Sequence, residues 1–184
     1  IRETWEGSIK NSNNEYLLNM KTRKSPIPSF LTIKFDSKLK LDNVNFSRIF
    51  NINKGIEGRV EIIKEDDGYI WIADKFPLDE LELSISNNQF DRINGIINGK
   101  GSISSDQSYF DGRLAWSLGK YRNIELDNSL FDFSFKDDSF NVISSLYPVD
   151  GGRIEVDYDS NKNNLINLEF KNISTSWTIL TALD

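Results

Sequence analysis

Apolar and polar residues alternate at every second position along most of this chain, and this alternation limits the possible folds more than any other feature. The clearest stretch runs from residue 109 to residue 135. Its apolar positions are Leu114, Trp116 and Leu118, then Ile124 and Leu126, then Phe131, Phe133 and Phe135. A later stretch repeats the pattern with Ile154, Val156 and Tyr158. Because successive side chains of a β-strand point to opposite faces, the alternation predicts strands with one apolar and one polar face.

The same periodicity predicts strands from one end of the chain to the other. Besides those within 109–135, the expected strands are 5–10, 15–21, 30–35, 59–64, 69–73, 81–86, 96–104, 140–145, 153–158 and 165–171. Turn residues such as Asp, Gly and Asn separate them. Only two short segments, 76–81 and the tail 176–184, have a spacing that favours helix. The expected fold class is therefore all-β with little helix.

A short glycine-led unit recurs along the chain. It consists of Gly, a polar residue and then an apolar–polar–apolar run, and it begins at Gly58, Gly112 and Gly152. The intervals between the copies are unequal, so the unit is not a strict solenoid repeat. It favours a meander built from similar strand pairs. The 184 residues are therefore expected to form a single β-rich segment, 1–184.

The chain contains no cysteine and no histidine. These absences remove thiol nucleophiles, disulfides, the usual zinc sites and the most common general base near neutral pH. The acidic pairs Asp66–Asp67 and Asp137–Asp138 lack the spacing of a calcium loop and fall where hairpin turns are expected. No metal, cofactor or catalytic residue is therefore expected, and an enzyme is the least favoured class of protein.

Charge and hydropathy limit the classes of partner that this chain is expected to bind. The formal net charge of −6 disfavours nucleic acid, because phosphate binding needs clustered Lys and Arg. No apolar run reaches the roughly 18 to 20 residues of a membrane-spanning helix. The sequence does not open on a signal peptide, so we expect residue 1 to be a boundary within a longer protein. Aromatic residues make up 12% of the chain, and on alternating strands they either fill a core or line a binding face.

The order of elements between Phe76 and Asp159 resembles the β-rich repeats of the TamB family and its AsmA-like relatives. The elements are a Pro-Leu connector at 77–78, a glycine-containing stretch "GIINGKG" at 95–101, a Gly-led strand at 112–118, a strand at 124–128, a strand of alternating acidic and apolar residues, and a Gly-Gly strand at 151–156. The resemblance covers residues 76–171, the best-matching repeat unit. It extends to residues 1–75 only in general character.

The resemblance implies an elongated, strongly curved open sheet with an apolar concave face, of which this chain would be an internal piece. TamB-like proteins are anchored in the inner membrane and extend through the periplasm or the equivalent intermembrane space. They partner with an Omp85-type outer-membrane barrel protein and are implicated in moving phospholipid between the membranes and in outer-membrane assembly. The expected ligands are therefore phospholipid acyl chains, with membrane contact through parts of the full-length protein outside this chain. The residues expected to line the groove are Leu114, Trp116, Leu118, Ile124, Leu126, Phe131, Phe133, Phe135, Ile154, Val156 and Tyr158.

Two other classes of function stay open on the sequence alone. A carbohydrate-binding β-sandwich would close two sheets on each other and expose flat aromatic residues such as Trp71 or Trp116 on an outer face. A structural or adhesive β-repeat module would fill its interior with the same Phe and Leu residues and bind nothing. The structure of the sheet distinguishes these three functions. An open apolar channel on the inner face favours lipid binding, a closed dry core favours the structural module, and an exposed Trp cluster favours sugar binding.

Overall fold

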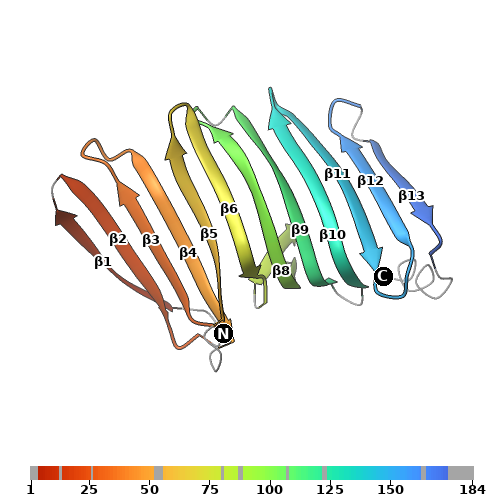
Figure 1. The fold of residues 1–184 in the computed structure, drawn as a ribbon, viewed down its shortest axis with the longest axis horizontal. Coiled ribbons are helices and arrows are strands. Elements are labelled where there is room, and N and C mark those ends of the chain that lie inside the picture. Colours follow the sequence, from red (N-terminus) through yellow and green to blue (C-terminus); the bar gives the residue numbers. More distant parts are fainter. Residues whose placement is uncertain are drawn as a thin grey trace.

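The computed structural model describes residues 4–12, 14–25, 27–51, 56–79, 81–86, 89–106, 108–121, 124–162 and 165–173. These residues form thirteen strands in one sheet and no helix, which confirms the all-β fold class. Accordingly, no helix long and apolar enough to cross a membrane occurs among them. The strands are β1 (Thr4–Ser12), β2 (Glu15–Arg23), β3 (Ser29–Phe35), β4 (Leu41–Asn51), β5 (Ile56–Glu65), β6 (Gly68–Pro77), β7 (Leu81–Ser86), β8 (Gln89–Ser104), β9 (Tyr109–Tyr121), β10 (Ile124–Lys136), β11 (Ser139–Pro148), β12 (Arg153–Asp159) and β13 (Leu165–Lys171) (Figure 1).

The strands form an antiparallel meander, in which each strand returns beside the one before it (Figure 1). Strands β1 to β6 and β8 to β13 make a path of twelve neighbours, and β7 pairs only with the first part of β8. The path begins at β1 and ends at β13. The sheet is therefore open, with two edges, and is not closed into a barrel.

Acidic residues form several of the connecting turns. The pairs Asp66–Asp67 and Asp137–Asp138 lie in the turns between β5 and β6 and between β10 and β11, as the sequence predicts. In the turn between β3 and β4, the carboxylate of Asp36 accepts hydrogen bonds from the backbone N–H of Lys38 (2.8 Å) and of Lys40 (2.9 Å). Such carboxylate-to-backbone bonds stabilise a tight reversal of the chain.

Cross-strand pairing sorts the side chains of the sheet into two faces. Directly paired residues of antiparallel strands point the same way, so a row of partners can be followed from β1 to β13. The first inner row is Ile9, Leu18, Ile33, Val44, Ile62, Trp71, Gly101, Gly112, Phe133, Val142, Tyr158 and Ile166. The second inner row is Gly7, Met20, Leu31, Phe46, Val60, Ala73, Gly99, Leu114, Phe131, Ser144, Val156 and Leu168. No charged residue occurs in either row.

The outer face has a different composition. The row that lies between the two inner rows, but points the other way, is Ser8, Asn19, Thr32, Asn45, Glu61, Ile72, Lys100, Arg113, Asp132, Ile143, Asp157 and Asn167. All but two of these residues are polar or charged. The alternation in the sequence therefore becomes one apolar face and one mainly polar face over the full width of the sheet.

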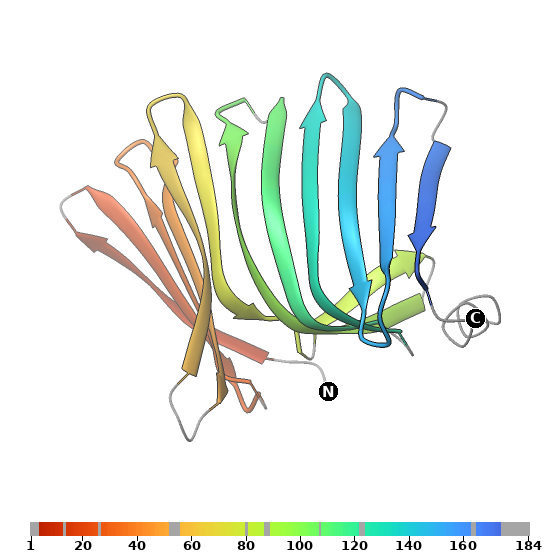
Figure 2. The ribbon, with the colours of Figure 1, turned by 45° about the vertical axis from the view of Figure 1, so that its right-hand side comes forward.

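The sheet bends toward its inner face along a crease, and Figure 2 shows the long strands β8 to β10 curving in their lower parts. Register shifts occur on neighbouring strands at Ile49/Asn51, Ala73/Phe76, Asn94/Ile96 and Asp127/Leu130. Positive φ values mark the same line at Lys75 (47°), Gly95 (120°) and Leu118 (52°). Because a bulge bends its strand, a line of bulges folds the whole sheet into a half-pipe.

The most buried apolar side chains lie next to the crease, on the inner face. Phe76, Leu126 and Ile154 are each buried to 5% exposure or less, and the hydroxyl residue Ser129 is fully buried. The hydroxyl of Ser129 donates a hydrogen bond to the backbone oxygen of Asp127 (2.9 Å) and accepts one from the N–H of Tyr147 (3.2 Å). The buried hydroxyl is therefore hydrogen-bonded both as a donor and as an acceptor. The inside of the bend is thus the nearest equivalent of a core in this open sheet.

A buried arginine forms hydrogen bonds across the crease. Arg48 is only 2% exposed, and its guanidinium donates hydrogen bonds to the backbone oxygens of Pro77 (2.6 Å) and Asp79 (2.7 Å). Its central carbon lies 5.8 Å from the centre of the Phe76 ring, within cation–π range. Arg48 therefore links β4 to the segment that leaves β6.

Two sequence predictions are corrected by the structure, and one observed strand was not predicted. Segment 76–81 is not a helix, since β6 runs to Pro77 and β7 begins at Leu81; Pro77 sits at the end of its strand, where a missing N–H is tolerated. Segment 124–128 is not a separate strand, because β10 continues through a bulge to Lys136. Strand β4 has no sequence prediction, since Arg48 occupies an inner position and interrupts the apolar alternation. The predicted helical tail, 176–184, lies outside the described residues.

Candidate functional site

The candidate site is the concave apolar groove formed by the two inner rows. Each row contributes one residue from every strand of the twelve-strand path. With strands about 4.8 Å apart, the groove is roughly 50 Å long. The described residues form one sheet, with no second sheet packed over this face. The groove is therefore continuous and open, unlike the core of a sandwich.

Aromatic rings gather in the groove in separate clusters. Trp5, Phe46 and Phe76 form a chain of ring contacts, with centroids 6.2 Å and 5.2 Å apart. Farther along, Phe140 and Tyr158 have centroids 6.3 Å apart. Each cluster takes its rings from different strands, so the groove surface is built by the register of the sheet and not by any one segment.

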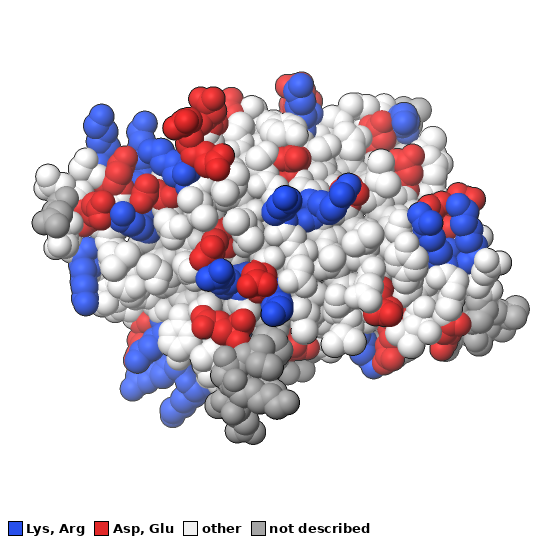
Figure 3. All heavy atoms as spheres, in the orientation of Figure 1, with Lys and Arg blue, Asp and Glu red and all other residues white. Residues whose placement is uncertain are grey.

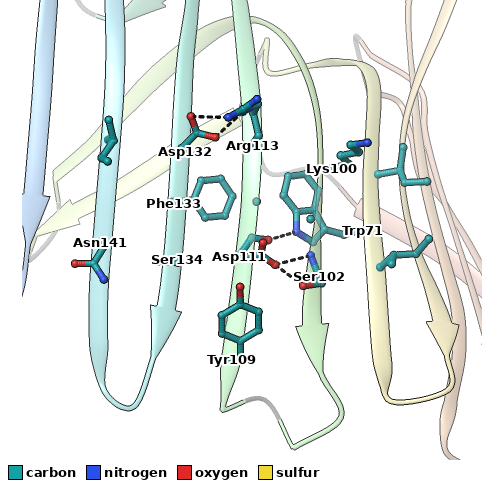
Figure 4. Close-up of a pocket in the computed structure, with 15 residues that line it drawn as sticks. Trp71, Lys100, Ser102, Tyr109, Asp111, Arg113, Asp132, Phe133, Ser134 and Asn141 are labelled. Carbon is teal, nitrogen blue, oxygen red and sulfur yellow. Dashed lines mark hydrogen bonds and ion pairs between the residues drawn. The ribbon is translucent and has the colours of Figure 1, made fainter.

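The central cluster depends on two glycines. Trp71 on β6 and Phe133 on β10 belong to the same inner row, and the two positions between them are Gly101 and Gly112. The indole lies against both glycines. It also approaches Phe133, as Figure 4 shows. Its Nε1 donates a hydrogen bond to the backbone oxygen of Asp111 (3.0 Å). A side chain at either glycine would occupy the space of the indole.

A second tryptophan is placed in the same way at the crease. Trp116 lies against Gly95 and Gly119, and its Nε1 donates a hydrogen bond to the backbone oxygen of Asn94 (2.9 Å). Its ring also lies 6.3 Å from that of Phe131. Both tryptophans thus have their indole N–H satisfied by the backbone. Trp71 is only 8% exposed, so it does not offer the free flat face that sugar stacking requires.

The structure brings most of the predicted lining residues onto the inner face. Leu114, Phe131, Phe133, Val156 and Tyr158 belong to the two inner rows, and their neighbours Trp116, Phe135 and Ile154 lie on the same face. Leu126 is also on this face, because it pairs with Pro148 two positions along β11 from Leu146. Ile124 lies beyond the crease and is half-buried.

Leu118 is the exception among the predicted lining residues. Its side chain is 72% exposed and its backbone has a positive φ of 52°. Leu118 has no partner in the pairing of β9 with β10, since Trp116 pairs with Ser129 and the next pair joins Gly119 to Leu126. The extra residue of the bulge breaks the period-two count that grouped Leu118 with Trp116.

Several inner-face residues were not among the predicted lining residues. Trp71, Phe110 and Val142 complete the central cluster, and Phe110 lies 5.2 Å from Phe133, centroid to centroid. Each sits at an apolar position of an alternating stretch, so the signal was present in the sequence. What the sequence lacks is the pairing register that places these strands beside one another.

The outer face carries scattered charges over a largely uncharged surface, as Figure 3 shows. A hollow of about 580 Å³ lies over β6 and β8 to β11, and its lining includes Ile70, Ile72 and Ile143. At this hollow Arg113 donates to both carboxylate oxygens of Asp132, at 2.6 Å and 3.3 Å (Figure 4). An exposed ion pair of this kind contributes little free energy. We therefore take the groove, and not this hollow, as the candidate site.

Titratable groups do not gather in the groove. Among the described residues, no three His, Cys, Asp or Glu side chains lie close enough together to hold a metal ion. The pKa that departs most from its ordinary value is that of Asp106, in the turn between β8 and β9. Hydrogen bonds from the hydroxyls of Ser104 and Ser108 lower this pKa to about 2. This carboxylate is exposed and stabilises its own turn. The chemistry of the groove is therefore that of apolar contact.

No family model, curated protein or solved structure matches this chain.

Proposed function

We propose that the inner groove carries the acyl chains of phospholipids along the sheet, as part of a TamB-like protein that transfers lipid between an inner and an outer membrane. The observation that carries this proposal is the pair of uncharged inner rows, which cross all twelve strands without a break. An acyl chain could lie at any point along such a surface. The proposal requires no catalytic residue.

The energetics of lipid movement favour a surface of this kind. Exposing a methylene group to water costs about 0.8 kcal/mol, so a chain of about 16 carbons costs roughly 12 kcal/mol. A long apolar trough lowers this barrier at every step, whereas a single deep pocket would hold the chain in place. The wide spacing of the aromatic clusters fits weak contact spread along the groove.

The proposed setting is the periplasm or intermembrane space, with the full-length protein anchored in the inner membrane and its far end meeting an Omp85-type barrel protein. These features rest on the resemblance of residues 76–171 to TamB-like repeats. A pull-down of the full-length protein from envelope extracts tests them. Recovery of an Omp85-type barrel would support the proposal, and fractionation of the protein with the cytoplasm would overturn it.

Neighbouring residues on β11 offer a matched test of the groove. Val142 lies in the first inner row between Phe133 and Tyr158, whereas Ile143 lies on the outer face and is 62% exposed. Both side chains are β-branched and apolar. Val142→Arg places a charge in the lipid path, while Ile143→Arg places the same charge in water.

The readout is transfer of a fluorescent phospholipid between vesicles of phosphatidylethanolamine and phosphatidylglycerol. We expect Val142→Arg to slow protein-dependent transfer about tenfold or more, and Ile143→Arg to change it less than about twofold. Thermal melts of both variants show whether each is folded. Equal transfer by two folded variants would contradict the proposal.

A photo-crosslinking amino acid tests the groove in cells. Phe133 points into the groove, and Asp132, the preceding residue, points outward. A crosslinker at position 133 of the full-length protein should capture phospholipid, and one at position 132 should not. Capture of protein alone at both positions would rule out lipid as the ligand of this surface.

A further inference from the structure

The hollow of about 580 Å³ on the outer face lies between two rows of outward side chains. One row is Ile72, Lys100, Arg113, Asp132 and Ile143, and the other is Ile70, Ser102, Asp111, Ser134 and Asn141. Each row takes one residue from each of β6, β8, β9, β10 and β11. With strands about 4.8 Å apart, the hollow is roughly 19 Å long. It is therefore elongated across the strands, in the middle of the sheet.

Backbone forms the floor of the hollow. Gly101 and Gly112 line it and belong to the first inner row, whose side chains point to the other face. On that other face the Trp71 indole lies against both glycines. Isoleucines lie at both ends of the hollow, on β6 and on β11. The hollow thus combines a flat floor, supported from behind by a buried ring, with apolar ends.

Two cations face each other along one side of the hollow. Lys100 and Arg113 are direct cross-strand partners, and like charges directly opposite each other destabilise a sheet. Asp132 neutralises Arg113 through the two hydrogen bonds already described. Among the described residues Lys100 forms no ion pair, and Figure 4 shows it apart from the Arg113–Asp132 pair. The two cations therefore have one carboxylate between them, and it contacts only Arg113.

Another pair of facing cations in the same sheet has a shared carboxylate. Arg153 on β12 and Lys171 on β13 are direct cross-strand partners, and Glu155 forms ion pairs with both of them. Further lysines of the outer face also have acidic partners, namely Lys21, Lys34 and Lys120. Compared with the Arg153–Lys171 pair, the Lys100–Arg113 pair lacks the shared anion.

The hydrogen-bond donors at this position suit a carboxylate. The ammonium of Lys100 has three N–H donors, and the guanidinium of Arg113 has five. Arg113 uses its Nε and Nη2 for Asp132, which leaves Nη1 for a further acceptor. Hydrogen bonds from two cations to one carboxylate are among the stronger polar contacts in proteins. A ligand carboxylate would thus take the place here that Glu155 has between Arg153 and Lys171.

The opposite side of the hollow has polar groups of two kinds. Ser102 and Asp111 are bonded to each other, because the Ser102 hydroxyl and its backbone N–H both donate to the Asp111 carboxylate. The Ser134 hydroxyl and the Asn141 amide, on β10 and β11, form no hydrogen bond with the described residues. These two groups can therefore bond a hydroxyl or carbonyl of a ligand that extends along the hollow.

We propose that this hollow binds an elongated organic carboxylate. Lys100 and Arg113 hold the carboxylate group, and the apolar body of the ligand lies on the glycine floor beside Ile70 and Ile72. Ile72 is the direct cross-strand partner of Lys100, so the apolar and cationic parts of the site are adjacent. The site is on the face opposite to the groove, and the proposal does not depend on what the groove carries.

Naphthalene-2-carboxylate and the uncharged 2-naphthalenemethanol test the site as probes of nearly equal shape. The readout is NMR titration of the isoleucine and valine methyl groups, since Ile70 and Ile72 report the hollow and Val142 reports the inner groove. We expect the carboxylate to shift the Ile70 and Ile72 signals saturably, with a Kd below about 1 mM, and the alcohol to bind there at least about tenfold more weakly.

Equal binding of the two probes at Ile70 and Ile72 would overturn the proposal, because the cations would then play no part. Shifts confined to Val142 and other inner methyl groups would overturn it as well, since they place the probe in the groove. Naphthyl phosphate is the third probe. If it saturates these signals while the carboxylate does not, the assignment of the ligand as a carboxylate is wrong.

Replacement of the unpaired lysine is the first variant test. Lys100→Gln should weaken binding of the carboxylate about tenfold, because a charge-assisted hydrogen bond is lost. Lys10→Gln is the matched control: Lys10 lies on the outer face of β1 and also forms no ion pair with the described residues. It should change the affinity less than about twofold. Equal effects of the two variants would show that only the overall charge of the protein matters.

Removal of the internal competitor should have the opposite effect. Asp132→Asn keeps the shape of the side chain but frees the Arg113 guanidinium, so we expect the carboxylate to bind about three- to fivefold more tightly. Asp157→Asn, at the outer position paired with Ile143, removes the same charge from the next strand but one and should have less than about half of this effect. Weaker or unchanged binding by Asp132→Asn would contradict the role given to Arg113. The methyl spectra of all four variants show that each is folded.

Discussion

The indole of Trp71 and the ring of Phe133 are nearly parallel, at 14°, with their centroids 5.9 Å apart, although two whole strands separate β6 from β10. The contact exists because the intervening inner positions are Gly101 and Gly112. The tryptophan thus fills the space left by two missing side chains and joins four strands through one ring. Part of the groove floor is therefore a single side chain lying across backbone.

Replacing Gly112 by alanine tests this relationship. The added methyl group would meet the Trp71 ring and the end of the Phe133 ring, so we expect Gly112→Ala to lower the free energy of unfolding by about 1 to 3 kcal/mol. Urea unfolding followed by circular dichroism measures it. Trp71→Leu makes room for the methyl group, and the double variant should lose less than the sum of the two single losses. Strict additivity would show that the crowding is not real.

Alanine substitutions at two glycines with positive φ distinguish the cost of the backbone conformation from the cost of steric crowding. Gly95 (φ 120°) lies at the crease with the Trp116 indole against it, whereas Gly151 (φ 96°) has open space around it. Gly151→Ala should lower the free energy of unfolding by about 1 kcal/mol, the cost of the backbone conformation alone. Gly95→Ala should cost about 1 to 3 kcal/mol more, because a side chain also displaces the indole. Equal losses in urea unfolding would argue against close packing at the crease.

The buried guanidinium of Arg48 should be far more important than an exposed one on the neighbouring strand. Arg48→Met keeps the length of the side chain but removes the donors to the backbone oxygens of Pro77 and Asp79. We expect a loss of about 2 to 5 kcal/mol in the free energy of unfolding. Arg59 on β5 is exposed and pairs with Glu61, so Arg59→Met should cost less than about 1 kcal/mol. Similar losses in the two variants would contradict the role given to Arg48.

Asp106 should titrate well below an ordinary aspartate. Hydroxyl hydrogen bonds from Ser104 (2.6 Å) and Ser108 (2.7 Å), with the N–H of Ser108 (3.0 Å), favour its charged form and lower its pKa to about 2. Since the pKa is lower in the folded state, the stabilisation is complete above the unfolded value of 3.8 and is lost as the pH falls toward 2. Carboxyl NMR titration measures the pKa. Ser104→Ala should move it up toward 3.8, and an unchanged value would show that Ser104 is not its main partner.

The sequence could predict the strands and their faces because period two survives in almost every strand. The prediction of β7 and β13 matches the observed bounds, since turn residues flank both segments. Leu118 could not be placed from sequence, because one extra residue in a bulge reverses the face of everything beyond it. Strand β4 was missed because Arg48 occupies an inner position, and only its contact with Pro77, far along the chain, makes that burial possible.

The central groove could be predicted only in part. The alternation identified Phe131 and Phe133 as members of one face, but nothing local to Trp71 indicates that it reaches β10. That contact depends on the register of three successive strand pairs, which sets glycines opposite each other. Pairing register is a property of the whole sheet, and a single sequence without relatives does not specify it.

The meander has a mechanical consequence. Apart from the pairing of β6 with β8, every strand of the path is bonded only to its neighbours in the sequence, so the sheet is a nearly one-dimensional array. A pulling force applied to the two ends of the chain would load the hydrogen bonds of an edge strand one after another, as in opening a zip. An optical-tweezers trace should therefore show extension in many small steps, each the length of a strand or a hairpin; a single cooperative rupture would contradict this. Such a sheet can lose an outer strand under load and regain it while the rest of the trough stays folded.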